Sequence, residues 1–397
     1  MKRPLFSIVI PTRGRPALLR YALESALNQR FDDYEIVVSD NSDSDETFKL
    51  VNNFADNRIR YVKTDRILSM PDSWEFALTK ATGEYVTFLG DDDVHSSYLL
   101  RCIERVLRDG SYDVISWNRA HYFFGDYPDA CKAYHLRIHP FSGTIRIVST
   151  IMDLCRKLFQ LQLPLEIPLF LNSFCSKRLI DTARNKLGRI FYPPAPDYSS
   201  CLVVLGLSET LLYLDIPLRI GGHSALSTAR SVSSTRAFVR DFGGSPLFEY
   251  VPLKKAVTPI NTVAESLMRV KQAFPERFGA FDLNWHRYFF LNYFELRTRV
   301  QKGLVDRESM DEFFETLRDQ FPWPTRTRIR LSIYYRSFRQ VMRRLISRSP
   351  LLSALEGWVR GRPPSETWVR CPSIIDAVRY LDTQILPTYV GALGLSE

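Results

Sequence analysis

Short apolar runs alternate with amphipathic stretches along the first third of the chain. Each run has four to six residues, many of them β-branched, which is typical of buried parallel strands. The stretches between them repeat apolar residues at helical spacing. The pattern predicts strands at 5–10, 35–39, 59–62, 85–89 and 113–117, and helices at 16–29, 43–54, 73–81 and 96–109. This alternation predicts an α/β fold with a mostly parallel sheet covered by helices on both faces.

The pattern loosens after residue 118 and changes again near residue 230. Helices are predicted at 148–161 and 201–207, a strand at 211–216, and a Gly-Gly-His turn at 221–223. Further on, helical periodicity dominates, at 262–274, 285–302, 309–320 and 328–347. We therefore divide the chain into an α/β domain over 1–230 with halves 1–118 and 119–230, a linker over 231–260, and a mainly α-helical, arginine-rich domain over 261–397.

The composition narrows the class of protein. The chain has 397 residues, 45% hydrophobic and 24% charged, which excludes a disordered or fibrous protein. Its six cysteines are scattered without a C-x-x-C pair, which argues against a disulfide scaffold or zinc site and favours a reducing compartment. The apolar run at the N-terminus is too short for a signal-peptide core, and no apolar stretch is long enough to span a membrane. We expect a cytoplasmic protein.

The net charge of +9 comes from one segment of the chain. Residues 325–362 contain ten arginines and one acid, Glu356, so this segment carries the whole excess. An apolar stripe runs through it at helical spacing, made of Tyr334, Phe338, Val341, Met342 and Leu345. A basic amphipathic helix of this kind favours an anionic membrane surface, so we expect peripheral attachment to the inner face of the membrane. The alternatives are a helix packed on its own domain and RNA binding, and no nucleic-acid motif accompanies the charge, so we expect no nucleic-acid partner.

Three adjacent carboxylates, Asp91, Asp92 and Asp93 (the acid triplet), follow the strand predicted at 85–89. They repel one another unless a cation neutralises them. Alternate members can converge on one side and offer the hard oxygen ligands that Mg²⁺ or Mn²⁺ prefers. The competing interpretation is a solvated acidic turn that caps the next helix.

Three segments occur in one order along the N-terminal part of the chain: FSIVIPTRGR at 6–15, YEIVVSDNS at 34–42 and ATGEYVTFLGDDD at 81–93. Together they resemble the nucleotide-sugar-binding half of glycosyltransferase family 2, whose members have the GT-A fold. The resemblance is strong over residues 5–118 and traceable to about 230. It implies a Rossmann-like GT-A domain that binds a nucleotide-diphosphate sugar, followed here by a mainly α-helical domain that matches nothing recognisable.

The resemblance assigns roles residue by residue. Asp40 matches the acid that binds the base ring; a carboxylate suits the N3–H of uracil or thymine, so a UDP- or dTDP-linked sugar is expected. Asp93 and Asp91 match the outer positions of the DxD motif and are the expected ligands of Mn²⁺ or Mg²⁺. Asp91 also faces the sugar side. The remaining expected substrate-binding residues are Pro11, Thr12, Arg13, Ser73, Trp74 and Asp92. Trp74 can equally be a core residue.

The second half of the domain offers a general base and two further contacts. An inverting transfer needs a carboxylate that removes the proton of the acceptor hydroxyl. Asp197 is the best match, although relatives usually have a preceding acid and here it follows Pro196; it can also be the N-cap of the next helix. His223 is a candidate metal ligand. Arg230 is a candidate contact of the diphosphate leaving group.

We therefore expect a metal-dependent, inverting hexosyltransferase that uses a nucleotide-diphosphate sugar and a saccharide or lipid-linked glycan acceptor, as in polysaccharide biosynthesis. One alternative is nucleotidyl transfer, although the loop after the first strand lacks the expected glycines and lysine. The other is a non-catalytic module that binds nucleotide or glycan. A dehydrogenase is excluded because no G-x-G-x-x-G follows the first strand.

Overall fold

The structure is a computed structural model that describes residues 3–225, 227, 248–305, 307–347 and 366–392. The first elements in chain order are β1 (Phe6–Thr12), α1 (Pro16–Leu27), β2 (Tyr34–Asp40), α2 (Glu46–Asn52), β3 (Ile59–Lys63), α3 (Met70–Lys80), β4 (Tyr85–Phe88), β5 (Val94–His95), α4 (Leu99–Asp109) and β6 (Val114–Phe123). The predicted strands and helices of this part are all present, with shifts of a few residues at their ends.

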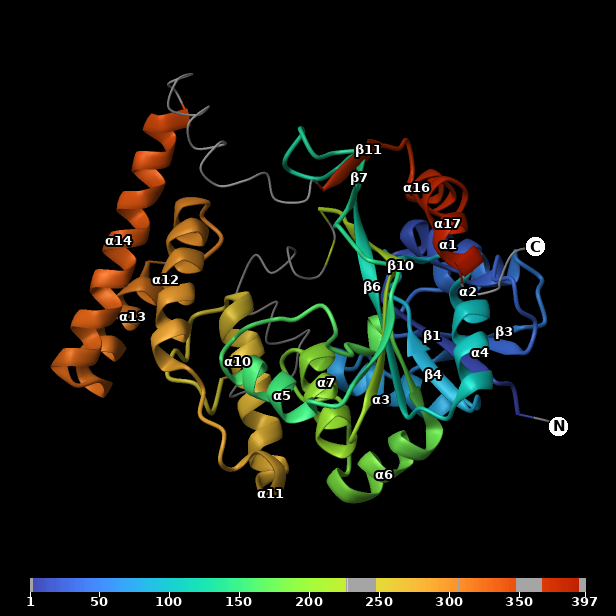
Figure 1. Cartoon of the computed structure of the whole chain (residues 1–397), viewed down its shortest axis with the longest axis horizontal. Coiled ribbons are helices and arrows are strands. Elements are labelled where there is room, and N and C mark those ends of the chain that lie inside the picture. The colour runs from blue at the N-terminus through green and yellow to red at the C-terminus, as the bar shows by residue number, and fades with distance from the viewer. Residues whose placement is uncertain (1–2, 226, 228–247, 306, 348–365, 393–397) are drawn as a thin grey trace.

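The middle of the chain adds β7 (His135–Ile138), β8 (Ile145–Val148), α5 (Ile151–Phe159), β9 (Ser173–Ser176), α6 (Lys177–Leu187), α7 (Pro196–Leu207) and β10 (Leu211–His223). The last part contains α10 (Pro259–Ala273), α11 (Pro275–Phe278), α12 (Trp285–Gln301), α13 (Glu308–Gln320), α14 (Trp323–Ser347), β11 (Thr367–Arg370), α16 (Ile374–Tyr380) and α17 (Leu386–Ala392). Figure 1 shows the sheet between helices and the later helices α10–α14 stacked to one side.

The strands form one mixed sheet. Its main path runs β11-β7-β6-β9-β4-β1-β2-β3, and β10 pairs with β6, β8 and β5. β1 to β4 are parallel, as are β6 and β10, but the pairs that involve β5, β7, β8, β9 or β11 are antiparallel. The sheet is therefore less parallel than the sequence predicts, because strands such as β6 and β7 are joined without a crossover helix.

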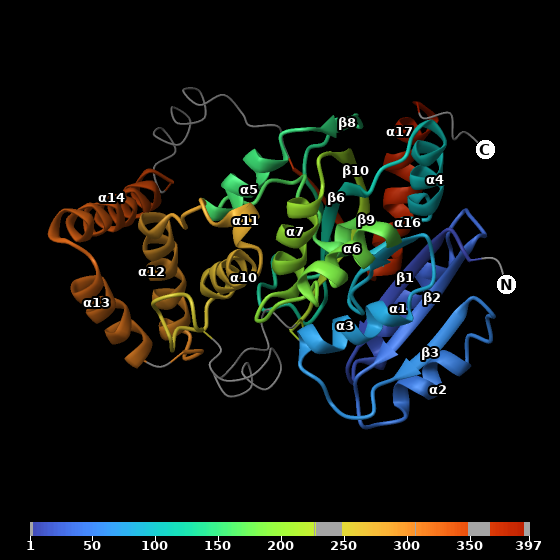
Figure 2. The ribbon, with the colours of Figure 1, turned by 90° about the horizontal axis from the view of Figure 1, so that it is seen from below.

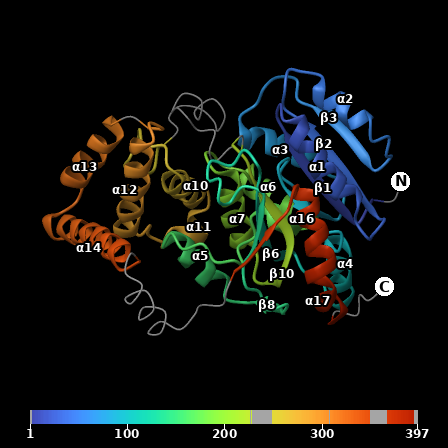
Figure 3. The same cartoon turned by 90° about the horizontal axis from the view of Figure 1, so that it is seen from above.

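Helices cover both faces of the sheet, as predicted. Side chains alternate along β1, so that Ile8 and Ile10 belong to one hydrophobic cluster and Val9 to the other. The first cluster is closed by α1, α4, α16 and α17, and the second by α3, α5, α7 and α10 (Figures 2 and 3). The two clusters make the sheet a rigid platform for the loops at its ends.

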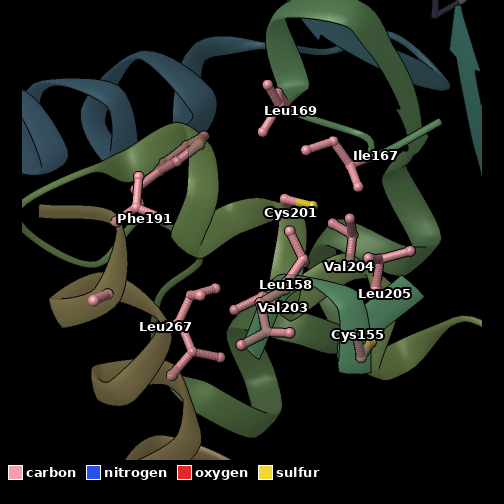
Figure 4. Packing of buried hydrophobic residues seen from close by; sticks show 14 of the residues in the cluster. Cys155, Leu158, Ile167, Leu169, Phe191, Cys201, Val203, Val204, Leu205 and Leu267 are labelled. Atoms are coloured by element: carbon pink, nitrogen blue, oxygen red, sulfur yellow. The ribbon is translucent and has the colours of Figure 1, made fainter. Parts of the chain in front are cut away.

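The helix α7 is buried along most of its length. Val203, Val204 and Leu205 have no exposed surface, and they lie among side chains of α5 and α10 (Figure 4). A helix that is apolar on all sides needs neighbours on all sides. This packing fixes the N-terminal end of α7, where the candidate base Asp197 lies.

The C-terminal part differs from the prediction in one respect. The sequence assigns residues after 261 to a helical domain, but β11 adds to the sheet beside β7, and α16 packs against α1, β5 and β10. The strand is only four residues long and mostly exposed, so its periodicity is too weak to detect. The division of the chain into domains at about 230–260 stays a prediction.

The buried His95 gives a test of the fold. It is 1% exposed, and neither ring nitrogen has a hydrogen-bond partner within the described ranges. Burial, assisted by Arg219, lowers the pKa of His95 to about 3. In the unfolded chain this histidine binds a proton below about pH 6.5, but in the folded chain it does so only near pH 3. The free energy of unfolding therefore decreases as the pH falls from about 6.5 toward 3.

We expect His95→Leu to reduce the pH dependence of the free energy of unfolding by about 1.4 kcal/mol per pH unit over this range. The measurement is the free energy of unfolding in urea at pH 7, 6 and 5 for both proteins. Parallel pH profiles would mean that His95 titrates normally in the folded chain.

Candidate functional site

The polar ends of β1, β2 and β4 meet at one edge of the sheet. Thr12 ends β1 and lies beside Asp40, which ends β2. The acid triplet follows β4, which is paired with β1 on its other side. Ligands of open α/β sheets bind at the carboxyl ends of parallel strands. Segments about 80 residues apart in the sequence therefore meet at one edge of the sheet.

Asp91 is held by two residues of the loop after β1. Thr12 Oγ1 donates to Asp91 Oδ2 at 2.8 Å, and Arg15 NH2 lies 2.5 Å from Asp91 Oδ1. The carboxylate is buried, and desolvation raises its pKa despite the nearby guanidinium. Asp91 is therefore anchored to the β1 loop, and Arg15, which the sequence analysis did not select, supplies the positive charge.

The carboxylate of Asp92 is mostly buried beside those of its two neighbours in the triplet. Desolvation and the neighbouring Asp93 and Asp91 carboxylates raise its pKa to about 7. Ser227 Oγ donates to Asp92 Oδ2 at 2.8 Å. The three acids thus share a site where burial and like charge oppose full ionisation, and an added cation would relieve that repulsion.

Asp93 faces the strand β10. Arg219 donates to Asp93 Oδ2 within a buried ion pair, and the Gly222 N–H donates to Asp93 Oδ1 at 2.9 Å. A side chain at Gly222 would place its Cβ 1.8 Å from the Asp92 carbonyl oxygen, so only glycine permits this approach. The predicted turn at 221–223 is wrong, because these residues are the end of β10 and pair with β6.

His223 ends β10 next to a second histidine. Its Nε2 lies 2.9 Å from Nδ1 of His121 on β6, and its ring stacks on Phe123. Burial and the neighbouring His223 lower the pKa of His121 to about 2, so His121 is a neutral imidazole. The Cβ position of Gly221 lies 3.7 Å from both Asp93 Oδ1 and His121 Nδ1, which places the histidine pair beside the acid triplet.

These donors fit a divalent cation by their chemistry. Carboxylate oxygens and a neutral imidazole nitrogen are ligands of Mn²⁺, and each oxygen of Asp93 accepts one hydrogen bond and keeps further acceptor capacity. Within the described ranges, however, no three histidine, cysteine, aspartate or glutamate side chains already surround one point that could hold an ion. A cation at this site therefore has to engage Asp93 and His223 in addition to their present partners.

Asp197 lies in the first turn of α7. The helix begins at Pro196 with Ala195 at the N-cap, so the alternative role of Asp197 as N-cap does not hold. Desolvation raises its pKa, and the charges of Arg219 and Arg119 act in the opposite direction. Arg219 is thus bonded to Asp93 and within electrostatic reach of Asp197, so the candidate base and the acid triplet lie near the same arginine.

Asp40 is completely buried at the other end of the site. Tyr61 OH donates to Asp40 Oδ2 at 2.9 Å, and the Ser42 N–H donates to Asp40 Oδ1 at 3.0 Å. Each oxygen keeps a second lone pair that can accept from a base N–H. The carboxylate is therefore oriented by its neighbours before any ligand binds.

The other residues predicted to contact the substrate differ in how far they are exposed. Pro11 and Arg13 flank Thr12 at the end of β1 and are partly exposed. Ser73 is buried within α3, and the N-cap of that helix is Ser69 rather than Ser73. Trp74 is 7% exposed and packs against Phe88 and Phe191, with ring centroids 5.1 and 5.3 Å away.

Trp74 is thus a core residue, as its alternative interpretation holds, and not a stacking platform for a base. Arg230 lies outside the described residues, as does the 348–362 part of the arginine-rich segment.

Four side chains of the site escaped the sequence analysis: Arg15, Arg119, His121 and Arg219. Each is a single polar residue with no motif of its own. The only available signal is position. All four lie a few residues beyond the strands predicted at 5–10, 113–117 and 211–216, and a buried polar side chain there has to face a polar partner.

Residues 7–151 match the family described as Glycosyl transferase family 2. One relative is a GalNAc(5)-diNAcBac-PP-undecaprenol beta-1,3-glucosyltransferase of Campylobacter jejuni, 38% identical over 27% of this chain and 36% of its own length. Another is a UDP-Glc:alpha-D-GlcNAc-diphosphoundecaprenol beta-1,3-glucosyltransferase of Escherichia coli, 33% identical over 22% of this chain and 36% of its own. The matched segment thus spans little more than a third of these relatives.

Among solved structures, S. aureus TarS 1–349 in complex with UDP-GlcNAc has a TM-score of 0.50 and 15% identity, covering 84% of this chain and 91% of that chain. This likeness concerns the fold alone. With the mixed sheet and its acid triplet, it defines the class as a GT-A fold protein followed by a helical C-terminal region. Over residues 7–151, the chain is similar to glycosyltransferase family 2.

Proposed function

We propose that this protein is a metal-dependent, inverting glycosyltransferase that moves a sugar from a UDP- or dTDP-linked donor to a saccharide or lipid-linked glycan acceptor. The observation that carries the proposal is the position of Arg219, which bonds to Asp93 and lies within electrostatic reach of Asp197. The candidate donor-binding acid and the candidate base thus both lie near Arg219, which supports a shared site in a chain that is similar to family 2 over residues 7–151.

The donor is bound along the edge formed by β1, β2 and β4. Asp40 accepts the N3–H of a uracil or thymine ring, because it is oriented by Tyr61 and Ser42 and keeps acceptor capacity. Pro11, Thr12 and Arg13 lie between that carboxylate and the acid triplet, where a ribose and a diphosphate would pass. Asp91 and Asp92 contact the sugar side.

Asp93, with Asp91 and His223, would hold Mn²⁺ or Mg²⁺. A cation held there would supply positive charge that neutralises the diphosphate and makes it a better leaving group. Arg15 and Arg219 add positive charge on either side of the triplet, which orients its carboxylates toward the diphosphate. Arg230 is a further candidate contact of the leaving group.

The transfer itself is a single displacement. Asp197 removes the proton of the acceptor hydroxyl as its oxygen attacks the anomeric carbon, the bond to the diphosphate breaks, and the nucleoside diphosphate leaves with the bonding electron pair. Configuration at the anomeric carbon is inverted. The raised pKa of Asp197 makes it a stronger base than an exposed aspartate.

The acceptor class is proposed from the relatives, whose names specify sugars linked through diphosphate to undecaprenol. None of the helices within the described ranges combines the length and the apolar character that a bilayer crossing requires.

The test is a donor assay with the whole chain. UDP-glucose, UDP-GlcNAc, a dTDP-hexose and a GDP-hexose are each incubated with Mn²⁺ and a short-chain polyprenyl-diphosphate sugar. We expect release of UDP or dTDP from one donor, arrest by EDTA, recovery with added Mn²⁺, and a β-linked product from an α-linked donor. A folded protein that binds the nucleotide without consuming any donor would instead be a non-catalytic nucleotide-binding module.

A further inference from the structure

The most exposed large hydrophobic side chains of the described residues all lie on one helix. They are Tyr334 (79% exposed), Trp323 (69%), Leu331 (65%), Tyr335 (64%) and Phe338 (60%), all on α14. Elsewhere in the described part of the chain, no large hydrophobic side chain reaches 60%. Surface hydrophobic residues are normally scattered singly, so a concentration of this kind marks an interaction surface.

These five residues share one face of α14, which we call the aromatic face. At 3.6 residues per turn, the positions 8, 11, 12 and 15 residues after Trp323 fall with it inside a sector of about 120° around the helix axis. The opposite face is already packed, since Ile329 and Ile333 are buried against the cluster that includes α12 and α13. α14 is thus apolar on two sides, and the side with Ile329 and Ile333 packs in the hydrophobic core.

The position of α14 leaves the aromatic face available. The helix lies with α13 at the end of the molecule farthest from α16, and α12 lies between it and α10 (Figures 1 to 3). A shallow hollow of about 510 Å³ indents this face, with the guanidinium-bearing Arg328 among apolar side chains, namely Trp323, Leu331 and Tyr335.

The charge of α14 has one sign. Its 25 residues contain seven arginines and no acid. On a helical projection, Arg328 borders the aromatic face on one side and Arg330 on the other. Both arginines are exposed. An apolar face flanked by cations is complementary to a surface that has an anionic outer layer over an apolar interior.

We propose that the aromatic face of α14 docks on an anionic phospholipid bilayer. Tryptophan and tyrosine rings suit the headgroup level because they are apolar with one polar atom, and arginines on both flanks pair with lipid phosphates. A second copy docked through the same face would bring its own Arg328 and Arg330 against this pair, and so charge disfavours it. The proposal depends on α14 alone, so it stands or falls independently of the transfer reaction.

The experiment is vesicle sedimentation of the whole chain. Vesicles of phosphatidylglycerol mixed with phosphatidylcholine are compared with phosphatidylcholine alone, at low and high salt. We expect the anionic vesicles to bind at least about tenfold more tightly, with the difference shrinking at high salt. Leu331→Ser combined with Tyr334→Ser is expected to weaken binding about tenfold, and Arg328→Gln combined with Arg330→Gln to reduce the preference for anionic lipid.

The matched control is Ile147→Ser, which removes an exposed side chain (58%) on β8, remote from α14 in sequence, and is expected to bind as the original chain does. Thermal unfolding checks that each variant is folded. Equal binding to both vesicle types, or equal loss in the control, would overturn the proposal. So would a dimer that the Leu331/Tyr334 variant dissociates, which would assign the face to a second copy, or binding of single-stranded RNA without any binding of vesicles.

Discussion

We expect Asp197→Asn to lower kcat about a thousandfold while the dissociation constant of the nucleoside diphosphate stays unchanged. The amide keeps the size of the side chain and its place in the first turn of α7 but cannot accept the proton of the acceptor hydroxyl. The measurement pairs steady-state turnover with calorimetric titration of the nucleotide. Donor binding depends on the edge formed by β1, β2 and β4, so the two readouts separate base catalysis from donor recognition.

The pH dependence of kcat gives a second signature of the same residue. Asp197 acts only when ionised, and desolvation raises its pKa. Activity is therefore expected to fall as the pH drops through that raised value, above the pH of about 4 where an exposed aspartate protonates.

Asp181→Asn, at an exposed aspartate on α6 that pairs with Lys177, is the matched control for Asp197→Asn and is expected to keep full activity. If both variants keep full activity, Asp197 is not the base.

We expect Arg219→Met to cost about 3–5 kcal/mol of unfolding free energy. The variant keeps much of the apolar stem but leaves the carboxylate of Asp93 buried without its guanidinium partner. Adding Asp93→Asn to that variant removes the stranded charge, so the double variant is expected to recover part of the loss. Chemical denaturation of the four proteins of this double-mutant cycle measures the coupling.

The control for that cycle is the exposed pair of Arg105 and Asp109 on α4, whose charged atoms are 2.7 Å apart. Arg105→Met is expected to cost less than about 1 kcal/mol, because solvent screens the pair. If Arg219→Met costs no more unfolding free energy than the control, the ion pair does not organise the site. Arg219 would then no longer support the proposal that Asp93 and Asp197 act in one site.

The donor-binding part of the fold was predictable because its signals are local. A buried strand gives an apolar run, and the polar residue that ends it lies at the sheet edge, so Thr12, Asp40 and the acid triplet could be placed from the sequence. Trp74 shows the limit of this reasoning. An aromatic residue at helical spacing can face a ligand or the core, and only its contacts with Phe88 and Phe191 decide for the core.

The partners of the acids were not predictable because they come from distant parts of the chain. Arg219 is 126 residues from Asp93, and His121 is 102 residues from His223. A Gly-Gly pair usually indicates a turn, yet Gly221 and Gly222 extend β10. Glycine is needed at position 222 because the backbone there passes too close to Asp92 for any side chain. Such contacts follow from the register of β10 against β6, which no local pattern contains.

The central claim is that the acid triplet binds a nucleoside diphosphate through a divalent cation. Calorimetric titration of UDP, dTDP and GDP, with and without Mn²⁺, on the original chain and Asp93→Asn tests it most directly. The account predicts that UDP or dTDP binds only with Mn²⁺ and that Asp93→Asn abolishes this binding without unfolding the protein. Binding that is equally tight without the cation, or unchanged in Asp93→Asn, would contradict it.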